Sequence, residues 1–205
     1  MTATTTHEAA HGTRMPAKDT LAAVHAASGP RDIVITTMTP ARDWMLLTPH
    51  PLDMVLVPSA MGSAPSMGLG LALAQPDRRV IVLNGDGSML MNLGSLVTIA
   101  NAGAANLIVI VFVNGTYEVT GSQPVPGAGV VDYAALARAA GFTSVHAYAS
   151  LDAWRRDVRR LIDATGPTFV SLAVEPVHGQ PGPKSPGPAR ERARRFREAV
   201  AGSTP

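Results

Sequence analysis

Short runs of apolar residues alternate along this sequence with longer segments in which apolar residues recur every three or four positions. The runs, such as RDIVITT and NLIVIVFVN, lack the regular polar alternation of half-exposed strands and are typical of strands buried on both faces. They predict strands near 32–36, 53–57, 79–84, 107–113, 144–147 and 168–174, with helices near 17–28, 64–74, 88–102, 132–140 and 151–164.

This alternation of strands and helices predicts an α/β fold. Parallel strands joined by right-handed helical crossovers form a doubly wound, mostly parallel six-stranded sheet with helices on both faces. Local signals support the helix boundaries: Asp132 and Ser150 are N-cap residue types, and Gly141 and Gly166 stand where helices are expected to stop.

The chain of 205 residues is long enough for one domain with a full core, which we place at 17–175. Residues 1–16 have no apolar core and are expected to be a flexible N-terminus. Residues 176–205 begin with the Pro- and Gly-rich PVHGQPGPKSPGPAR, predicting a linker, and continue into a short basic helix. We expect a cytoplasmic protein, because cysteine is absent and no apolar run approaches the roughly 20 residues of a membrane span.

Composition and charge exclude several classes of site and of binding partner. Without cysteine, this chain has no disulfide, thiolate-zinc site, iron–sulfur ligand or cysteine nucleophile. Residues 1–175 hold 11 Lys and Arg against 13 Asp and Glu, whereas 176–205 hold 6 against 2, so the basic character belongs to the tail. The body therefore lacks the basic surface expected of a nucleic-acid-binding domain. We interpret ARERARRFREAV as a solvated helix, with partner docking as the alternative.

An acid between two glycines, Gly85-Asp86-Gly87, follows the apolar strand VIVLN. In a doubly wound sheet, ligands bind at the carboxyl ends of the strands, and the helix expected from Ser88 would point its N-terminus at this edge, which suits a phosphate. The glycines leave the backbone open to a diphosphate. A carboxylate beside a diphosphate favours a shared hard cation such as Mg²⁺. A plain turn with a helix cap is the alternative.

A second oxygen ligand is predicted at the end of the next strand. NLIVIVFVN ends at Asn114-Gly115, and a βαβ unit brings two consecutive parallel strands to one sheet edge. Asp86 and Asn114 are thus expected to lie close together, although 28 positions separate them. A strand, Gly-Asp-Gly, a helix, a second strand and Asn-Gly in this order are more specific than either turn alone. This order predicts a metal–diphosphate site.

This combination resembles the cofactor motif of thiamine diphosphate enzymes, in which Gly-Asp-Gly is followed by an Asn pair; Val113 replaces the first Asn here. The segments VPSAMGSAPSMGLGLALAQPDRRVIVLNGDGSMLMNLGSL and NGTYEVTGSQPV are similar to the diphosphate-binding subunit of sulfopyruvate decarboxylase and the C-terminal domain of phosphonopyruvate decarboxylase. The similarity covers about residues 30–175.

The resemblance implies thiamine diphosphate and Mg²⁺ as cofactors. The metal ligands would be the Asp86 carboxylate, the Asn114 side-chain oxygen and the Thr116 carbonyl. In the family, Met61 would be the apolar support that bends the cofactor, and the carbonyl of Ser59, which stands where many relatives have glycine, would face its aminopyrimidine ring. The implied cofactor-binding residues are Ser59, Met61, Gly85, Asp86, Gly87, Ser88, Asn114, Thr116 and Tyr117.

The implied activity is non-oxidative decarboxylation of a 2-oxo acid resembling sulfopyruvate or phosphonopyruvate, with release of CO₂ and an aldehyde. Glu118, Tyr117 and Gln123 are catalytic candidates, with loop structure as the equal alternative. The family's activating glutamate belongs to a pyrimidine-binding domain for which this sequence has no matching segment. We therefore expect a partner subunit that supplies it, a hetero-oligomer, and no activity from this chain alone.

Other interpretations remain open at this stage. The same cofactor serves a carboligase, and the chain could be a non-catalytic Mg²⁺–diphosphate module; a ferredoxin-linked oxidoreductase is disfavoured by the absence of cysteine.

SMGLGLALA is not a dinucleotide fingerprint, because Gly68 and Gly70 lie inside a helical pattern and are better explained by helix packing. Arg42 is either a cation for a substrate anion or a surface residue. We do not expect catalysis by the remaining candidates, His50, His146 and His178.

Overall fold

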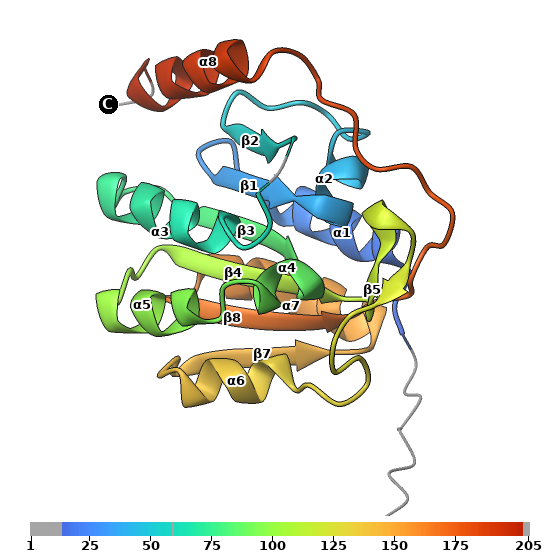
Figure 1. Cartoon of the computed structure of the whole chain (residues 1–205). Coiled ribbons are helices and arrows are strands. Elements are labelled where there is room, and N and C mark those ends of the chain that lie inside the picture. The colour runs from blue at the N-terminus through green and yellow to red at the C-terminus, as the bar shows by residue number, and fades with distance from the viewer. Residues whose placement is uncertain (1–13, 59, 203–205) are drawn as a thin grey trace, which may run out of the picture.

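A computed structural model describes residues 14–58 and 60–202 of the chain. Its main sheet contains six parallel strands in the order β2-β1-β3-β4-β8-β7 (Figure 1), which confirms the predicted α/β fold. The strands are β1 (Ile33–Thr37), β2 (Asp53–Leu56), β3 (Val80–Gly85), β4 (Leu107–Val113), β7 (Ser144–Tyr148) and β8 (Thr168–Ala173).

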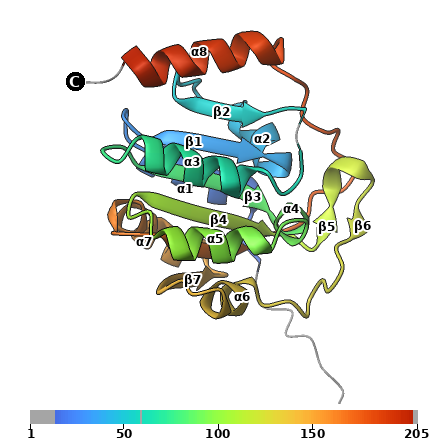
Figure 2. The same ribbon diagram turned by 60° about the vertical axis from the view of Figure 1, so that its left-hand side comes forward.

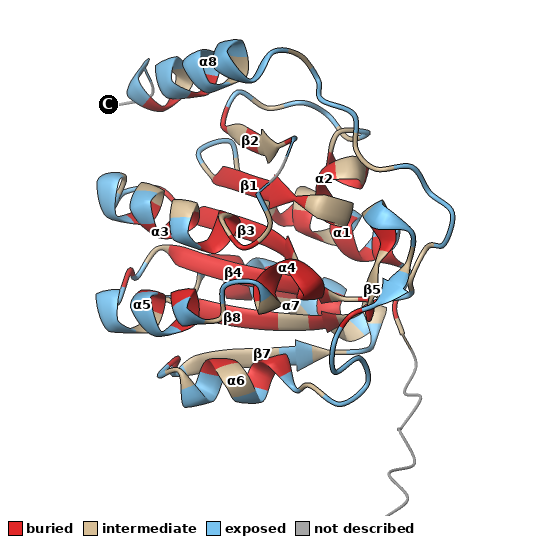
Figure 3. Cartoon of the chain, in the orientation of Figure 1, coloured by how far each residue is buried: buried red, intermediate tan, exposed pale blue. Residues whose placement is uncertain are grey.

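Helices cover both faces of this sheet (Figures 1 and 2). On one face lie α3 (Ala64–Ala74), α5 (Gly94–Ala102) and α6 (Tyr133–Ala139); on the other lie α1 (Ala17–Ala27) and α7 (Leu151–Asp163). Successive side chains of a strand point to opposite faces, so Val80 and Val82 join the core beneath α3, whereas Ile81 joins the core beneath α1 and α7. The central strands are consequently buried along their length (Figure 3), which explains their unbroken apolar sequences.

Helix α3 approaches the sheet closely at Gly68. A Cβ atom there would lie 2.3 Å from Cγ2 of Val82, so helix packing accounts for this glycine. The same interpretation is wrong for Gly70, where a Cβ atom would meet nothing within 4 Å, because this residue faces outward.

The predicted N-caps form as expected, but one predicted stop differs. The Asp132 carboxylate accepts from the backbone N–H of Ala135 at 2.9 Å, and the Ser150 hydroxyl accepts from Ala153 at 3.5 Å. Gly141 follows α6 with φ +106°. Gly166 instead lies beyond the end of α7, where a Cβ atom would be 2.5 Å from the carbonyl oxygen of Leu107; close approach to β4 explains this glycine.

The prediction of one helix over 88–102 is wrong. The segment forms two helices, α4 (Asp86–Leu90) and α5, separated by a turn at Asn92. The Asn92 backbone N–H bonds to the Met89 carbonyl, and its side-chain amide donates to the Gly62 carbonyl at 3.1 Å, so a distant segment fixes the break.

Four short elements near the carboxyl ends of the strands were not predicted. They are the helix α2 (Met38–Trp44), the hairpin strands β5 (Thr116–Tyr117) and β6 (Gln123–Pro124), and the 3₁₀ turn η1 (Glu118–Thr120) between those strands. Among the described residues, no helix is long and apolar enough to cross a membrane.

The N-terminal boundary also differs from the sequence prediction. Residues 1–13 of the segment predicted to be flexible lie outside the described residues, but the prediction is wrong for 14–16. Met15 is 1% exposed, its N–H donates to the Ala173 carbonyl and its carbonyl accepts from Glu175, both at 2.9 Å. The apolar side chain of Met15 belongs to the core beneath α1 and α7, which holds this short segment against β8.

The C-terminal segment crosses the molecule. After β8, residues 176–188, here called the C-terminal strap, pass the β5–β6 hairpin and lead to α8 (Ala189–Gly202) beside β2 (Figure 1). Phe196 and Val200 of α8 are buried, and the Arg192 guanidinium donates to the carbonyls of Val55 and Val57. The helix is therefore solvated on one side, as interpreted, and packed on the other.

Candidate functional site

A cleft opens between the carboxyl ends of β1 and β3. After β1 the chain passes through α2 to β2 on one side, and after β3 it passes through α4 and α5 to β4 on the other, so this is the topological switch point of the sheet. The cleft has a free volume of about 30 Å³. The predicted residues that line it are Met61, Gly85, Asp86, Gly87, Ser88, Asn114, Thr116, Tyr117 and Glu118.

Asp86 is the buried anion of the cleft. It is the first residue of α4, is 3% exposed, and accepts hydrogen bonds from the backbone N–H groups of Gly87 at 2.8 Å and Gly115 at 2.7 Å. Burial raises the pKa of its carboxyl above the ordinary 3.8, while these two hydrogen bonds and the charge of Arg14 oppose the rise. The bond to Gly115 joins the end of β3 directly to the turn after β4.

Asn114 directly follows β4, lines the same cleft as this carboxylate and is 6% exposed. Its side-chain Oδ1 accepts from the Thr116 N–H at 2.9 Å, and its Nδ2 donates to Oε1 of Glu118 at 2.9 Å. The Arg14 guanidinium donates to the Asn114 backbone carbonyl, also at 2.9 Å. The structure thus brings Asp86 and Asn114 to one edge, as the βαβ argument predicts.

Tyr117 closes one side of the cleft. Its ring lies over Gly87, where a Cβ atom would be 2.3 Å from Cε1 of the ring. This glycine is required by the tyrosine above it. Gly85, in contrast, has nothing within 4 Å of an added Cβ atom and leaves the backbone accessible.

Of the remaining predicted residues, Ser88 lines the cleft and also makes a structural contact, Ser59 lies outside the described residues, and Gln123 lies outside the cleft. The Ser88 hydroxyl accepts from the Gly62 N–H at 3.0 Å and thereby fixes the segment after Met61. Gln123, in β6, is exposed and is not brought into the cleft; its side-chain carbonyl accepts a long, 3.5 Å bond from the Thr120 hydroxyl.

Arg42 is neither a surface residue nor a free cation. Its side chain is 11% exposed and its guanidinium lies 3.1 Å from the Asp43 carboxylate and 3.6 Å from Glu118. The histidines lie away from the cleft lining: His50 in the turn before β2, His146 within β7, and His178 in the C-terminal strap. Burial lowers the pKa of His146.

Sequence reasoning missed three residues of this neighbourhood. Thr39 of α2 donates to Glu118 at 3.0 Å, and Met38 lines the cleft with φ +58°, a strained backbone conformation for a non-glycine residue. Tyr133 of α6 is buried, and burial with the nearby charge of Asp86 raises its pKa. No local motif marks them, because each reaches the site through tertiary packing.

The polar groups of the cleft that could bind a ligand are mainly oxygen atoms. Among the described residues that line the cleft, Thr116 has a buried side-chain oxygen, Oγ1, without a hydrogen-bond partner. Oδ1 of Asn84, in β3 just before Gly85 and outside the cleft lining, is also buried and unpaired. Among the described residues, no group of three His, Asp or Glu side chains could hold a metal. Carboxylate, amide and carbonyl oxygens fit a hard cation that shares its coordination with a phosphate.

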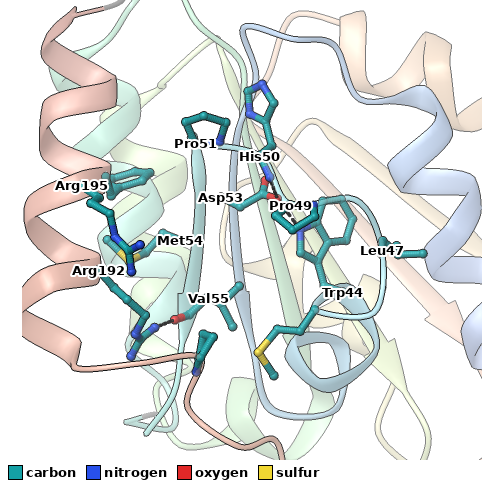
Figure 4. A pocket seen from close by; sticks show the side chains of 13 residues that line it. Trp44, Leu47, Pro49, His50, Pro51, Asp53, Met54, Val55, Arg192 and Arg195 are labelled. Carbon is teal, nitrogen blue, oxygen red and sulfur yellow. Dashed lines mark hydrogen bonds between the residues drawn. The ribbon is translucent and has the colours of Figure 1, made fainter.

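A second hollow, of about 440 Å³, lies between α8 and the segment from Trp44 to Val55 (Figure 4). Its Asp53 carboxylate already accepts from Trp44 Nε1 at 2.9 Å and from the His50 N–H at 3.2 Å, and burial raises its pKa. These bonds hold the loop before β2. Asp86 and Asn114 line the other cleft, so the two hollows are separate.

Comparisons with known proteins agree with this geometry. Residues 36–172 match the family described as thiamine pyrophosphate enzyme, C-terminal TPP binding domain. The chain belongs to this family. The match spans the sheet from β1 to β8, including both residues of the predicted metal pair.

The chain matches two curated relatives over different shares of their own lengths. The chain is 41% identical over 196 residues to a phosphonopyruvate decarboxylase from Streptomyces viridochromogenes, spanning 94% of this chain but only 47% of that protein. It is 38% identical over 165 residues to a sulfopyruvate decarboxylase subunit beta from Methanothermobacter thermautotrophicus, spanning 80% of this chain and 84% of that subunit.

A solved structure supports the fold. An enzyme from Mycobacterium smegmatis described as thiamin diphosphate-dependent superposes with a TM-score of 0.69 at 21% identity, covering 81% of this chain and 33% of that one.

Proposed function

We propose that this chain is the diphosphate- and Mg²⁺-binding subunit of a two-chain, non-oxidative 2-oxo acid decarboxylase. The observation that carries the proposal is the pairing of Asp86 with the turn after Asn114, through the Gly115 N–H, at the switch point of the sheet. Membership of a thiamine pyrophosphate-binding family supports the cofactor. The names of the two curated relatives support a 2-oxo acid substrate that carries a phosphonate or sulfonate group.

The residues of the cleft have binding roles in this proposal. Mg²⁺ would be held by the Asp86 carboxylate, the Asn114 side-chain oxygen and the Thr116 carbonyl, and the remaining ligands would be diphosphate and water oxygens. When bound, thiamine diphosphate supplies an electron sink for the charge left on the substrate carbon as CO₂ departs. Met61 would support the cofactor, and Tyr117, beside Gly87, would shield the diphosphate from water.

The proposed partner subunit supplies the acid that activates the cofactor. The carboxylates that line the cleft in the described part of the chain are Asp86 and Glu118, and both are engaged by hydrogen bonds within this chain. Neither is available as a separate proton-transfer group. Similarity to most of a protein named as a subunit beta supports a two-chain enzyme.

Cofactor binding tests the metal assignment. Asp86→Ala is expected to abolish Mg²⁺-dependent binding of thiamine diphosphate, measured by calorimetry, because the cation loses its only charged protein ligand in the proposed set. Asp77→Ala removes the same charge from an exposed position and should leave affinity unchanged. Unchanged affinity in Asp86→Ala would contradict the assignment.

Turnover tests the two-chain arrangement. CO₂ release should be followed from phosphonopyruvate, sulfopyruvate and pyruvate, with this chain alone and with a co-purified pyrimidine-binding subunit. We expect turnover only from the pair, and preferentially with phosphonopyruvate or sulfopyruvate, which carry a second anionic group that pyruvate lacks. Robust decarboxylation by the lone chain would refute the need for a partner.

A further inference from the structure

Glu118, a catalytic candidate from the sequence, is a carboxylate buried at the cleft and engaged by hydrogen bonds within the chain. Its side chain has 0% exposure, and four donors surround it. Oε2 accepts from the Thr39 hydroxyl at 3.0 Å and lies 3.6 Å from the Arg42 guanidinium; Oε1 accepts from Asn114 Nδ2 at 2.9 Å and from the Val177 N–H at 2.7 Å. Both carboxylate oxygens accept hydrogen bonds from separate segments of the chain, so the network fixes the position of the Glu118 side chain.

The hydrogen bond from Asn114 to Glu118 decides which end of the Asn114 side-chain amide can face a metal ion. An asparagine amide has an oxygen that can bind a cation and an NH₂ group of nearly the same size that cannot. Oε1 of Glu118 also accepts from the Val177 N–H, so this oxygen is an acceptor and the NH₂ end of the Asn114 amide faces it. The Thr116 N–H, 2.9 Å from Oδ1, favours the same orientation. The amide oxygen is therefore turned away from Glu118.

We propose that Glu118 is a positioning residue: it orients the Asn114 amide so that Oδ1, and not Nδ2, is presented to the cation. The role rests on the proposed function, because it presumes a metal at Asp86 and Asn114. Partners that orient a metal ligand are worth 10- to 100-fold in metal affinity in known sites, which sets the scale of the expected effect.

The C-terminal strap takes part in this orientation. Val177, its second residue, donates to the same oxygen that receives Asn114 Nδ2. Farther along, a Cβ atom on Gly182 would lie 2.8 Å from Val119, so the strap runs against the turn that carries Glu118. The carboxylate is thus held between α2, the end of β4 and the strap, and cannot rotate without breaking bonds to all three.

Substitutions at Glu118 test this role in the full-length chain. The Mg²⁺ dependence of thiamine diphosphate binding should weaken 10- to 100-fold in Glu118→Ala, which frees the amide to rotate. Glu118→Gln retains a carbonyl that can accept from Nδ2 and should stay within about threefold of the wild type. Glu175→Ala, which removes an exposed carboxylate just before the strap, is the matched control and should bind normally. If Glu118→Ala does not fold, Glu118→Leu fills more of the space without a hydrogen-bond acceptor.

A second measurement needs no cofactor. The side-chain amide protons of Asn114 should exchange slowly in the wild type and in Glu118→Gln, and rapidly in Glu118→Ala, when followed by ¹⁵N-resolved NMR. Equal metal dependence in the wild type and Glu118→Ala, or unchanged amide exchange between them, would overturn the positioning role. A wild type that binds no thiamine diphosphate with Mg²⁺ would overturn the proposed function, and this role with it.

Discussion

Gly87 lies directly beneath the Tyr117 ring, whereas Gly85, two residues earlier in the same motif, faces open space. The sequence suggested one reason for both glycines, access of a diphosphate to the backbone. The structure separates them: Gly85 is compatible with that reason, and Gly87 is needed for contact with a side chain on another strand.

Alanine at each glycine tests this difference. Gly87→Ala should displace the Tyr117 ring and lower the free energy of unfolding by about 1 kcal/mol, the low end for overpacking, because Tyr117 is only partly buried and can move. Gly85→Ala should stay within about 0.5 kcal/mol of the wild type. Urea unfolding and the tyrosine ring signals in NMR report both effects; equal behaviour of the two variants would contradict the contact.

The buried Asp86 carboxylate predicts a pH dependence in metal-free protein. Because its pKa in the folded state is raised above 3.8, folding takes up a proton between these two pKa values. Stability from this residue is therefore present below pH 3.8 and is lost as pH rises through the raised pKa. Asp86→Asn should flatten that decline in unfolding free energy across this window, and an identical decline in both proteins would contradict the direction of the shift.

Sequence periodicity predicts well the elements whose buried apolar positions recur regularly along the chain. The four central strands β1, β3, β4 and β8 follow from burial on both faces, and α3 follows from helical spacing; both are local properties. The break at Asn92 and the short α2 depend on contacts with distant segments, such as the Asn92 bond to Gly62. Periodicity carries no information about those contacts.

Packing of α3 on the sheet gives a matched pair of substitutions. Gly68→Ala should lower the free energy of unfolding by about 1–3 kcal/mol, because Val82 in the core has no room for a Cβ atom 2.3 Å away. Gly70→Ala should raise it by up to about 1 kcal/mol, since alanine favours the helix and this position is open. Denaturant unfolding measures both, and a stabilising Gly68→Ala would contradict the close approach.

At the scale of the whole molecule, the predicted domain boundary at residue 175 cuts through the candidate site. The pairing of Asp86 with Asn114 could be predicted because consecutive parallel strands meet at one edge. The contribution of Val177 could not, because a Pro- and Gly-rich sequence resembles a linker whether or not it is fixed to the body. Only the folded structure shows that the C-terminal strap contacts Glu118 and that the helix after it, α8, lies beside β2.

Attachment of α8 should depend on Arg192. This guanidinium donates to the carbonyls of Val55, Val57 and Gly187, and hydrogen bonds from charged groups are worth about 1.5–3 kcal/mol. Arg192→Ala should therefore speed chymotrypsin cleavage after the buried Phe196 by about tenfold or more, since every 1.4 kcal/mol is tenfold in the opening equilibrium. Arg190→Ala, at an exposed position of α8 away from the cleaved bond, is the control; equal cleavage rates in Arg192→Ala and the wild type would contradict a docked helix.

The contacts of Arg14 have a practical consequence for handling the protein. Its guanidinium donates to the carbonyls of Asn114 and Val174, so the described chain begins beside the candidate cofactor edge, whereas α8 ends on the opposite side, near where the strands start (Figure 1). The chain that leads to an affinity tag or fusion at the amino end would meet the folded domain beside Asn114, at the edge proposed to bind the metal and the cofactor. A tag at the carboxyl end would keep that surface clear for assembly experiments.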